Sequence, residues 1–312
     1  MARAPLRRLR PVRALVTGAA GFVGRHLVAG LREAGDDVHE TDRHLGLDIL
    51  DPLALTDLLT SIRPEVVYHL AGQADVGGSW SSPVETFRIN AEGTLNVLQS
   101  AVRADVERVV AVASADVYGQ VPEADLPIGE DRAFRPVSPY GASKAAADVI
   151  ALQAYLGHDL GVLRARPFNH LGPGQSDRFV ASAVASRIAR NELSGSEEVP
   201  VGNLSARRDF TDVRDVVRAY RLLAERGQPG EAYNVCSGRD VAVQQIADRL
   251  VALADRRMAL VPDPDLLRPV DTPVLRGDPT RLHEATGWEP TIALDQTLTD
   301  VLDDWRKRVR ES

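Results

Sequence analysis

Tyr140 and Lys144 stand four residues apart in the segment SPYGASK, Ser138 to Lys144. Four residues make about one helical turn, so on a helix the phenol and the ammonium share a face. A phenol titrates near pH ~10 in water, and a cation held beside it favours the phenolate. The pair could therefore move a proton near neutral pH. The spacing is so common that, taken alone, it is better interpreted as a solvated helix start.

Ser114 gives the pair a context. It ends the apolar run RVVAVAS, Arg108 to Ser114, which predicts a buried strand. Ligands of open parallel sheets bind beyond the carboxyl ends of the strands, so Ser114, Tyr140 and Lys144 are predicted to converge on one crevice. The three groups suit hydride chemistry at a carbonyl. Ser114 would hold the oxygen, Tyr140 would move the proton, and Lys144 would lower the tyrosine pKa and hold a cofactor ribose.

A glycine-rich turn, TGAAGFVG, follows the first predicted strand and opens a helix. Gly18, Gly21 and Gly24 have a spacing that allows a tight turn, close approach of the backbone to a pyrophosphate, and close helix–strand packing. Phosphates would then lie at the helix N-terminus, where free N–H groups favour negative charge. The turn predicts a dinucleotide site. Its expected cofactor contacts are Gly18, Ala20, Gly21, Phe22 and Val23.

The preference between NAD and NADP depends on the end of the next strand. Asp42 lies there, roughly 20 residues past the glycines, where an acid bonds the adenosine ribose and repels a 2′-phosphate. It slightly favours NAD. Arg43 weakens this preference because an arginine can pair with that phosphate. Asp48 could accept from the adenine amino group or cap a helix, and the two interpretations are nearly even.

Strand and helix patterns alternate through the first two-thirds of the chain. This alternation predicts an α/β fold, a Rossmann-like doubly wound parallel sheet with helices on both faces. Apolar runs predict buried strands at 14–18, 66–72, 108–114 and 160–167. Periodic patterns predict helices at 22–34, 52–62, 83–104 and 139–156.

After Pro167 the pattern changes and predicts a smaller C-terminal α/β lobe. Its predicted elements are a helix at 178–192, a helix over Thr211–Glu225 with Thr211 as the N-cap, a strand at 231–238, a helix at 241–254 and two short final helices. The predicted parts are a mobile extension (1–12), a dinucleotide-binding domain (13–166, joined again by about 206–236) and the lobe (167–312).

Composition excludes several classes of protein. A net charge of −7 argues against general nucleic-acid binding, which needs a basic face. No apolar run approaches the ~18 residues of a membrane helix, and no secretory signal precedes the first strand. A single cysteine, Cys236, rules out an internal disulfide and fits a reducing cytoplasm. We expect no metal, a cytoplasmic location, and Cys236 buried and inert.

Several motifs together resemble the extended short-chain dehydrogenase/reductases, which act on nucleotide sugars. These are TGAAGFVG, HLAGQ, ASADVYG and SPYGASK. RPFNHLGPGQ, VGNLSARRDFTDVRDVVRAY, YNVCSG and GDPTRLHEATGWEP resemble the branch that contains GDP-mannose 4,6-dehydratases and GDP-4-dehydro-6-deoxy-D-mannose reductases. DVYGQVPEADLPIGE looks most like the reductases, which make GDP-rhamnose. The similarity runs from about residue 12 to about 308.

The resemblance implies further contacts. Asn169 would meet the sugar diphosphate, Arg208 the pyrophosphate and Arg268 a phosphate or ribose, while Val201 and Asn203 would lie near a guanine base. Arginine suits a diphosphate on physical grounds because its fork pairs with phosphate in bidentate fashion. Arg207 and Arg208 could also be a solvated charge pair, and Arg207 stays open. The remaining expected cofactor contacts are Ile49, Leu70, Ala71, Gly72 and Pro167, together with Tyr140 and Lys144.

Asp116 is the position that separates the candidate reactions. The resembling dehydratases have a threonine and, two places on, a glutamate that helps to remove C5–H. This chain has Ser114 and Asp116 instead. Aspartate is one methylene shorter, and a catalytic group must reach its proton. The sequence therefore favours NAD(P)H-dependent reduction of the C4 ketone of GDP-4-dehydro-6-deoxy-D-mannose, to GDP-D-rhamnose or its C4 epimer. A purely structural role for Asp116 stays open.

Three other functions stay open. A 4,6-dehydratase would keep NAD bound, and a 4-epimerase would use the same serine, tyrosine and lysine. From another class, the chain could be a non-catalytic NAD(H) sensor. We also expect a homodimer through helices 83–104 and 139–156, as in many of the proteins it resembles. His69, His170, Trp80, Trp288 and Trp305 are predicted to be packing residues. Asn90 could face the cofactor side or bond backbone in the core, and the resemblance favours the core.

Overall fold

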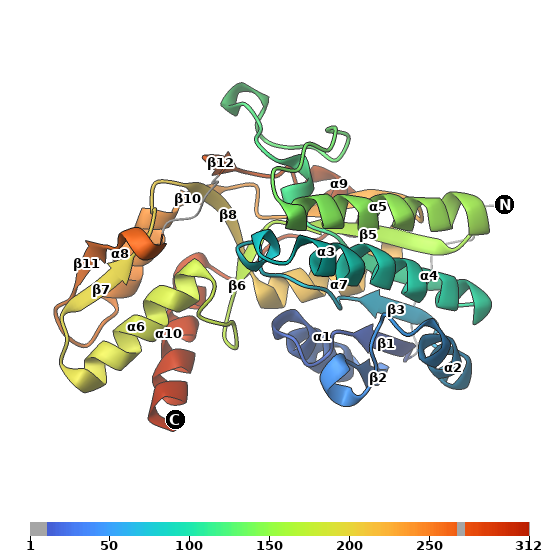
Figure 1. Ribbon diagram of the computed structural model, residues 1–312, viewed down its shortest axis with the longest axis horizontal. Coiled ribbons are helices and arrows are strands. Elements are labelled where there is room, and N and C mark those ends of the chain that lie inside the picture. Colours follow the sequence, from blue (N-terminus) through green and yellow to red (C-terminus); the bar gives the residue numbers. More distant parts are fainter. Residues whose placement is uncertain (1–10, 267–271, 312) are drawn as a thin grey trace.

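A six-stranded, wholly parallel sheet lies at the centre of the molecule, with strand order β2-β1-β3-β4-β5-β9 (Figure 1). The computed structural model describes residues 11–266 and 272–311. The strands alternate with helices along the chain, which confirms the predicted doubly wound α/β fold. The six strands are β1 (Arg13–Thr17), β2 (Asp37–Thr41), β3 (Val66–His69), β4 (Arg108–Val112), β5 (Gly161–Pro167) and β9 (Ala232–Val235).

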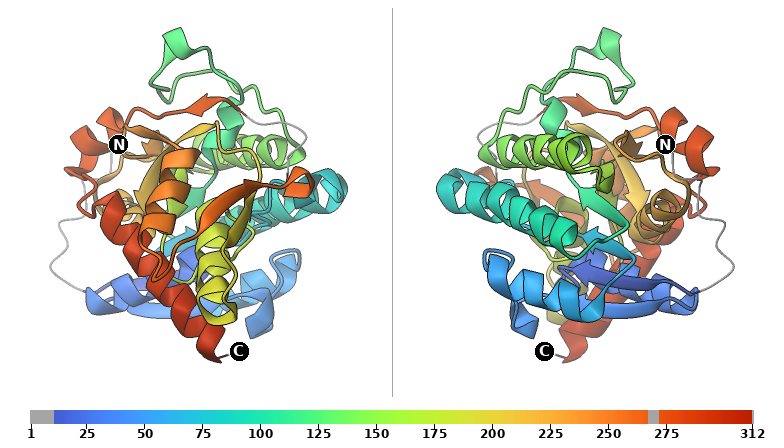
Figure 2. Two further views of the ribbon diagram at one scale, coloured as in Figure 1. Left: turned by 90° about the vertical axis from the view of Figure 1, so that its left-hand side faces the viewer. Right: turned by 90° about the vertical axis from the view of Figure 1, so that its right-hand side faces the viewer.

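Helices cover both faces of this sheet, because apolar strand residues point to both sides and each face needs a cover. One hydrophobic core joins the sheet to α1 (Phe22–Glu33), α7 (Val213–Arg226) and α9 (Thr280–Thr286). The opposite core joins it to α2 (Pro52–Ile62), α4 (Gly93–Arg103) and α5 (Pro139–His158). The second view in Figure 2 shows α4 and α5 lying side by side across the sheet.

Local sequence explains where the helices begin. Ser138 caps α5 by accepting a hydrogen bond from the Gly141 amide, and Pro139 occupies the first helical position. The cap of α7 was predicted wrongly. Thr211 belongs to strand β8 (Arg207–Asp212), and it is Asp212 that accepts from the Arg214 amide. Asp212 is the last residue of β8, directly before the first helical residue Val213, so its carboxylate is the one that reaches the free amides of the first turn.

The single helix predicted over 83–104 is interrupted. It consists of α3 (Pro83–Phe87), a π-helical turn (Arg88–Glu92) and α4. Asn90, in the turn, accepts a hydrogen bond from the Gln73 amide and donates to the Gln73 carbonyl. These side-chain bonds hold the widened turn against the loop after β3. The predicted core role of Asn90 is thus confirmed. The sequence did not predict the π-helical turn that accompanies these bonds.

A second layer of elements follows β5. Strand β8 pairs with β10 (Asp240–Ala242) on one side and β12 (Val274–Leu275) on the other, and β6 (Asn169–Leu171) also pairs with β8. A separate two-stranded sheet contains β7 (Glu198–Val201) and β11 (Ala259–Pro262). Three helices share its hydrophobic core: α6 (Val180–Ser194), α8 (Val243–Ala252) and α10 (Leu294–Glu311). Short 3₁₀ turns span Arg43–Leu45, Gly78–Trp80, Ala115–Tyr118, Glu123–Asp125 and Pro264–Leu266.

Two further predictions need correction here. Residues 241 and 242 belong to β10, so the helix predicted from 241 begins at 243, and the final helix has 18 residues rather than being short. Trp288 and Trp305 are buried as predicted, whereas Trp80, at the end of the Gly78–Trp80 turn, is 45% exposed. Cys236 is buried, and burial raises its pKa well above the usual value.

The division into domains stays a proposal. Helix α7 and strand β9 pack with the six-stranded sheet, in keeping with a return of the chain to the first domain, whereas β8 pairs within the second layer. Of the extension predicted over 1–12, residues 1–10 lie outside the described part of the chain.

Candidate active site

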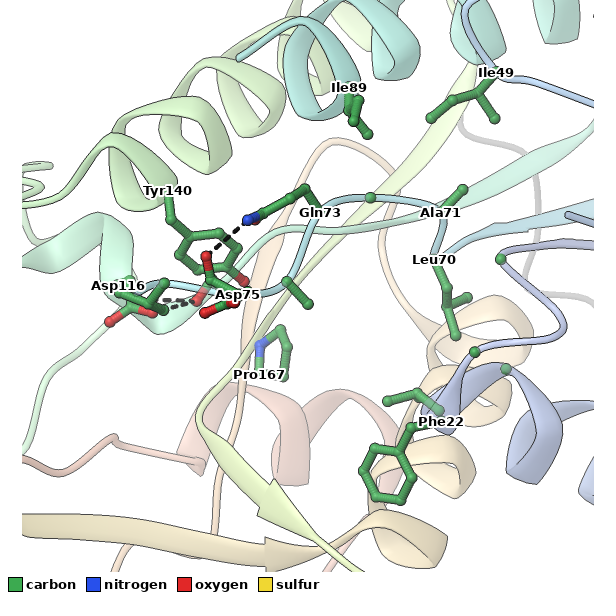
Figure 3. A pocket seen from close by; sticks show the side chains of 18 of the residues that line it. Phe22, Ile49, Leu70, Ala71, Gln73, Asp75, Ile89, Asp116, Tyr140 and Pro167 are labelled. Atoms are coloured by element: carbon green, nitrogen blue, oxygen red, sulfur yellow. Dashed lines mark hydrogen bonds between the residues drawn. The ribbon is translucent and has the colours of Figure 1, made fainter. Parts of the chain in front are cut away.

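A cavity of about 1330 Å³ lies at the carboxyl ends of β1, β3 and β4, between the six-stranded sheet and the second layer (Figure 3). Most of the residues predicted to bind cofactor or substrate line its wall. These are Gly18, Gly21, Phe22, Val23, Asp42, Arg43, Asp48, Ile49, Leu70, Ala71, Gly72, Ser114, Asp116, Tyr140, Pro167 and Asn169.

The glycine turn has the shape that a diphosphate needs. Gly18 has φ +71°, and a Cβ there would lie 2.7 Å from the Ala71 nitrogen. A Cβ at Gly24 would lie 2.1 Å from the Gly18 oxygen, so this residue lets α1 pack close to the turn. Gly21 caps α1 without a side chain, and the first turn of the helix carries no acid. Its free N–H groups and positive dipole end are therefore available to phosphate.

Ala20 does not belong to the cavity wall, although its carbonyl oxygen fixes the turn by accepting from Arg25 Nε at 2.8 Å. At the predicted adenosine end, Asp42 Oδ1 accepts from the His44 amide at 3.0 Å and Asp48 Oδ1 from the Leu50 amide at 2.9 Å. The cap of α2 is Asp51, so Asp48 stabilises the turn before that helix. Both carboxylates still face the cavity.

Ser114 and Tyr140 come together as predicted from the ends of different elements. Ser114 Oγ donates to Asp116 Oδ2 at 3.3 Å and accepts from the Asp116 amide at 3.2 Å, and it also hydrogen-bonds to the Tyr140 side chain. Burial raises the pKa of Tyr140, the Asp116 charge raises it further, and hydrogen bonding with Ser114 opposes both. The phenol is therefore protonated near neutral pH, which is the form that donates a proton.

Lys144 differs from the expectation in its partner. Its Nζ donates to the Val112 carbonyl at 2.9 Å, and burial lowers its pKa to about 8. The groups that shift the Tyr140 pKa are those already named, so the predicted lowering by Lys144 is not seen. The Lys144 ammonium therefore bonds the Val112 carbonyl of strand β4, whereas the helical spacing had predicted that it would act on the Tyr140 phenol. Lys144 does lie behind the cavity wall, since a Cβ at Gly72 would be 3.4 Å from Nζ.

The two histidines near the cavity have partners of their own. His69 is buried between the hydroxyls of Thr17 (2.8 Å) and Thr94 (3.0 Å), and burial, then Lys144, lower its pKa to about 3. His170 lines the cavity, bonds the Phe168 carbonyl and stacks on Phe22. Both are thus held as packing residues. Residues 11–266 and 272–311 contain no group of three His, Cys, Asp or Glu side chains arranged for a metal.

The predicted substrate residues are only partly brought together. Asn169 lines the cavity, but Val201 lies in the second hydrophobic core, and Asn203 Oδ1 accepts from the Ser205 amide and hydroxyl. Arg208 donates to the Arg207 carbonyl at 2.8 Å and does not line the cavity. Arg268 lies outside the described residues. The base-binding and phosphate-binding roles of these residues stay predictions.

Sequence reasoning missed several residues of the wall. Gln73 donates from Nε2 to the Asp75 carbonyl, beside Tyr140 (Figure 3), while its buried Oε1 has no partner within the described residues. Asp75 Oδ2 lies 3.8 Å from NH1 of Arg178, a wall residue just before α6. Gln73 and Asp75 follow strand β3, so the strand-end rule that found Ser114 could have found them. Arg178 and Phe179 gave no comparable signal.

Together, a glycine turn at a helix N-terminus and a serine and tyrosine at the same sheet edge define a dinucleotide-dependent enzyme. The pattern of the NAD dependent epimerase/dehydratase family matches residues 14–236, and the chain belongs to this family of extended short-chain dehydrogenase/reductases. It is an NAD(P)-dependent nucleotide-sugar enzyme, which uses NAD or NADP.

Two curated relatives are similar over nearly the whole chain. The GDP-6-deoxy-D-mannose reductase of Pseudomonas aeruginosa is 41% identical over 96% of this chain and 99% of its own. The UDP-glucose 4-epimerase of Mycolicibacterium smegmatis is 30% identical over 95% and 99%. Among solved structures, RMD from Pseudomonas aeruginosa complexed with NADPH superposes with a TM-score of 0.88 at 39% identity, covering 95% of this chain and 99% of that one.

A second solved structure, the UDP-glucose 4-epimerase of Thermus thermophilus in complex with NAD, has a TM-score of 0.85 at 28% identity and covers 94% of this chain and 99% of that one. The family thus contains enzymes bound to either cofactor. In the described part of the chain, the helices are too short or too polar to cross a membrane.

Proposed function

We propose that this enzyme reduces the C4 ketone of GDP-4-dehydro-6-deoxy-D-mannose with NADH or NADPH. The observation that carries the proposal is the protonated Tyr140, hydrogen-bonded to Ser114 at the wall that also holds the glycine turn. A ketone reductase needs such a proton donor next to the hydride source. The relative that is 41% identical is a GDP-6-deoxy-D-mannose reductase, and this similarity supports both the proposed reaction and a guanine nucleotide in the substrate.

The residues divide the reaction between them. When bound, NADH or NADPH supplies the hydride that joins C4. Tyr140 donates its proton to the C4 oxygen, and Ser114 turns its single hydroxyl proton from Asp116 Oδ2 to the same oxygen as charge develops on it. The ketone becomes an alcohol, and the phenolate that remains regains a proton from solvent. We assign Lys144 to the cofactor ribose and Asn169 to the sugar diphosphate.

A 4,6-dehydratase is the main alternative reaction, and a GDP-mannose 4,6-dehydratase of Yersinia enterocolitica is 25% identical. In this chain Asp116 accepts a hydrogen bond from Ser114, which holds the short carboxylate at its own turn. That arrangement supports reduction over removal of C5–H. An epimerase would reuse the same residues but would need no added reductant.

The three reactions give different results with the same purified protein. A reductase oxidises NADH or NADPH only when the 4-dehydro sugar is present. A dehydratase converts GDP-mannose, and an epimerase interconverts C4 epimers, each without added reductant. The protein would be a dehydratase if it converts GDP-mannose without reductant and oxidises neither NADH nor NADPH in the presence of the ketone. A Tyr140→Phe variant as active as wild type would instead favour a cofactor-binding sensor.

We also propose a homodimer that forms through α3, α4 and α5. Apolar side chains are exposed on α3 and α5, which is unusual for a monomer surface when they gather on one face. Val149 and Leu156 on α5 are 55% and 72% exposed and lie two turns apart on one side of the helix. Val84 and Phe87 on α3 are 73% and 50% exposed.

A further inference from the structure

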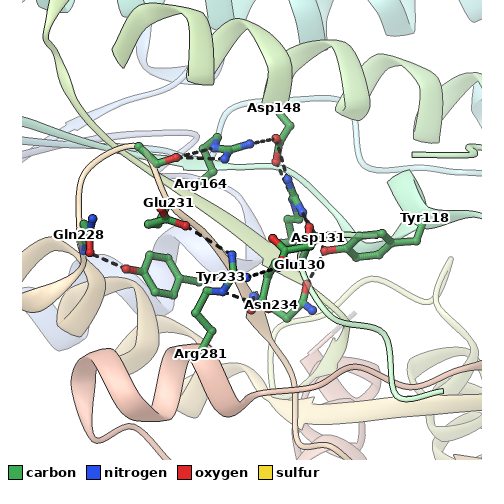
Figure 4. A network of polar contacts seen from close by, with 12 residues as sticks. Tyr118, Glu130, Asp131, Asp148, Arg164, Gln228, Glu231, Tyr233, Asn234 and Arg281 are labelled. Carbon is green, nitrogen blue, oxygen red and sulfur yellow. Dashed lines mark hydrogen bonds and ion pairs between the residues drawn. The ribbon is translucent and has the colours of Figure 1, made fainter. Parts of the chain in front are cut away.

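Figure 4 shows a polar network whose buried residues do not line the cavity. Its centre is Tyr118, which ends the turn that begins at Ser114. The Tyr118 hydroxyl donates to Asn234 Oδ1 at 2.7 Å and accepts from Arg166 NH1 at 2.9 Å. None of the tyrosine side chain is exposed. The residue therefore has no contact with a ligand in the cavity and acts through its neighbours.

Arg166 connects this tyrosine to helix α5. Its Nε and NH2 donate to the two carboxylate oxygens of Asp148 at 2.8 and 3.0 Å. Asp148 is on α5, four residues after Lys144 and eight after Tyr140, so the three side chains lie along one side of the helix. The Asp148 side chain is fully buried, and Arg164 donates to it as well at 2.6 Å. A bidentate pair of this kind fixes orientation as well as distance.

Other contacts complete the anchor at the turn. The Tyr118 ring packs edge-on against Phe134 and tilted against Phe168. Asn234 donates from Nδ2 to the Ile128 carbonyl, and its amide donates to Glu130 Oε1. Arg166 NH1 also donates to the Glu130 carbonyl. One tyrosine hydroxyl thus joins β5, β9 and the loop around residue 130 to the Ser114 turn, which we define as residues 114–118.

We propose that Tyr118 is a positioning residue that holds the Ser114 turn in register with helix α5. The contacts run from Ser114 through Tyr118, Arg166 and Asp148 to the helix that carries Tyr140. The proposed catalytic serine and tyrosine come from two separate elements, so their mutual distance depends on what ties those elements together. This inference rests on the proposed reductase function for its kinetic consequence, but the anchoring itself is independent of the substrate.

Tyr118→Phe is the variant that tests this. It removes the two hydroxyl hydrogen bonds and leaves the ring in its apolar packing. Small displacements of reacting groups reduce turnover steeply, so we expect kcat for the ketone to fall at least about tenfold. The KM for NADPH should stay within about twofold, because the glycine turn is untouched.

Tyr233→Phe is the matched control. Tyr233 is equally buried, at 2% exposure, and its hydroxyl accepts a hydrogen bond from the Gln228 amide at 2.9 Å. That bond holds a surface loop and, unlike the bonds of the Tyr118 hydroxyl, involves neither Arg166 nor Asn234. We expect this variant to keep the wild-type kcat. Thermal unfolding of both variants verifies that each is folded.

A double-mutant cycle separates positioning from general damage. If Tyr118 acts through Ser114, then Tyr118→Phe should cost little further activity in a Ser114→Ala background. Equal fold losses in both backgrounds, or a Tyr118→Phe kcat equal to wild type, would overturn the inference.

Hydrogen exchange measures the anchoring without any substrate. Amides of residues 114–118 should exchange faster in Tyr118→Phe than in wild type or Tyr233→Phe. Unchanged exchange in the turn would overturn the inference even if the enzyme is an active reductase. Faster exchange in a protein that fails to reduce the ketone would keep the anchor and reject the proposed function.

Discussion

Tyr140 has an environment suited to donating a proton. Burial and the nearby Asp116 carboxylate keep the phenol neutral, and Ser114 fixes its direction. Tyr140→Phe keeps the ring and removes the proton. We expect kcat to fall by about 10²–10⁴-fold, the usual contribution of a general acid, with NADPH affinity unchanged. Steady-state turnover and cofactor titration measure the two quantities. Tyr155→Phe, elsewhere on α5, is the control and should behave as wild type.

Lys144 predicts a dependence on pH. Its pKa of about 8 means that the ammonium is lost as the pH rises through that value. We expect kcat/KM for NADPH, which reports the free enzyme, to fall over the same range. In Lys144→Met this alkaline decline should disappear, because the titrating group is gone. A wild-type profile that stays level to pH ~10, the range of an ordinary lysine, would contradict this account of the lysine.

The same shift predicts the sign of a stability effect. The pKa of Lys144 is about 8 in the fold, against an ordinary value of 10.5 that applies to the unfolded chain. Between these values the unfolded chain binds more protons, so the free energy of unfolding of the wild type should rise with pH across this window. Denaturant titrations at several pH values test this against Lys144→Met. A difference between the two proteins that is constant with pH would contradict the assignment.

At the scale of elements, the glycine turn and α1 form a phosphate site that does not tolerate a Cβ. Gly24→Ala would place a methyl group 2.1 Å from the Gly18 oxygen. We expect a loss of about 1–3 kcal/mol of stability from this overpacking and weaker NADPH binding.

Gly30→Ala, on the same helix, is the matched control. Apart from its chain neighbours and the backbone of its own helix, no heavy atom of the described residues lies within 4 Å of the added Cβ. Alanine is the better helix former there, so we expect a gain of about 0.5–1 kcal/mol and unchanged cofactor affinity. Chemical denaturation and cofactor fluorescence measure both variants. Equal affinity in Gly24→Ala and wild type would exclude the turn as the phosphate site.

Elements with strong local signals could be predicted from the sequence. Helix α5 begins at its Ser138–Pro139 cap, and the buried strands follow their apolar runs. The interruption of 83–104 could not be predicted, because it depends on hydrogen bonds from Asn90 to the distant residue Gln73. The partner of Lys144 could not be predicted for the same reason. Spacing placed it beside the tyrosine on the helix, but only the folded sheet supplies the Val112 carbonyl.

At the scale of the whole molecule, the cofactor side of the cavity was easier to predict than the substrate side. Cofactor residues follow strand ends in a regular order, so one rule locates many of them. The opposite wall is built from irregular segments. Asp75 and Arg178 approach each other from two layers of the molecule, and no periodic pattern in either segment indicates that contact.

The proposed dimer predicts an effect of one surface substitution on molecular mass. The wild type should have a molecular mass of about twice 33.8 kDa in solution. Leu156→Asp should lower this mass toward that of the monomer, because it places a charge in the apolar contact. Leu193→Asp on α6 is the control, because Leu193 is also exposed, at 59%, but lies on a different helix. Sedimentation velocity separates the outcomes. A monomeric wild type would refute the dimer without affecting the proposed chemistry.

The central claim is that the cavity reduces a GDP-linked C4 ketone. The direct measurement mixes purified protein with GDP-4-dehydro-6-deoxy-D-mannose and NADPH or NADH, and follows the absorbance of the reduced nicotinamide. We predict oxidation of one cofactor molecule for each 4-hydroxy sugar formed, and its loss in Tyr140→Phe. A protein that binds the cofactor yet oxidises neither NADPH nor NADH in the presence of this ketone would contradict the claim.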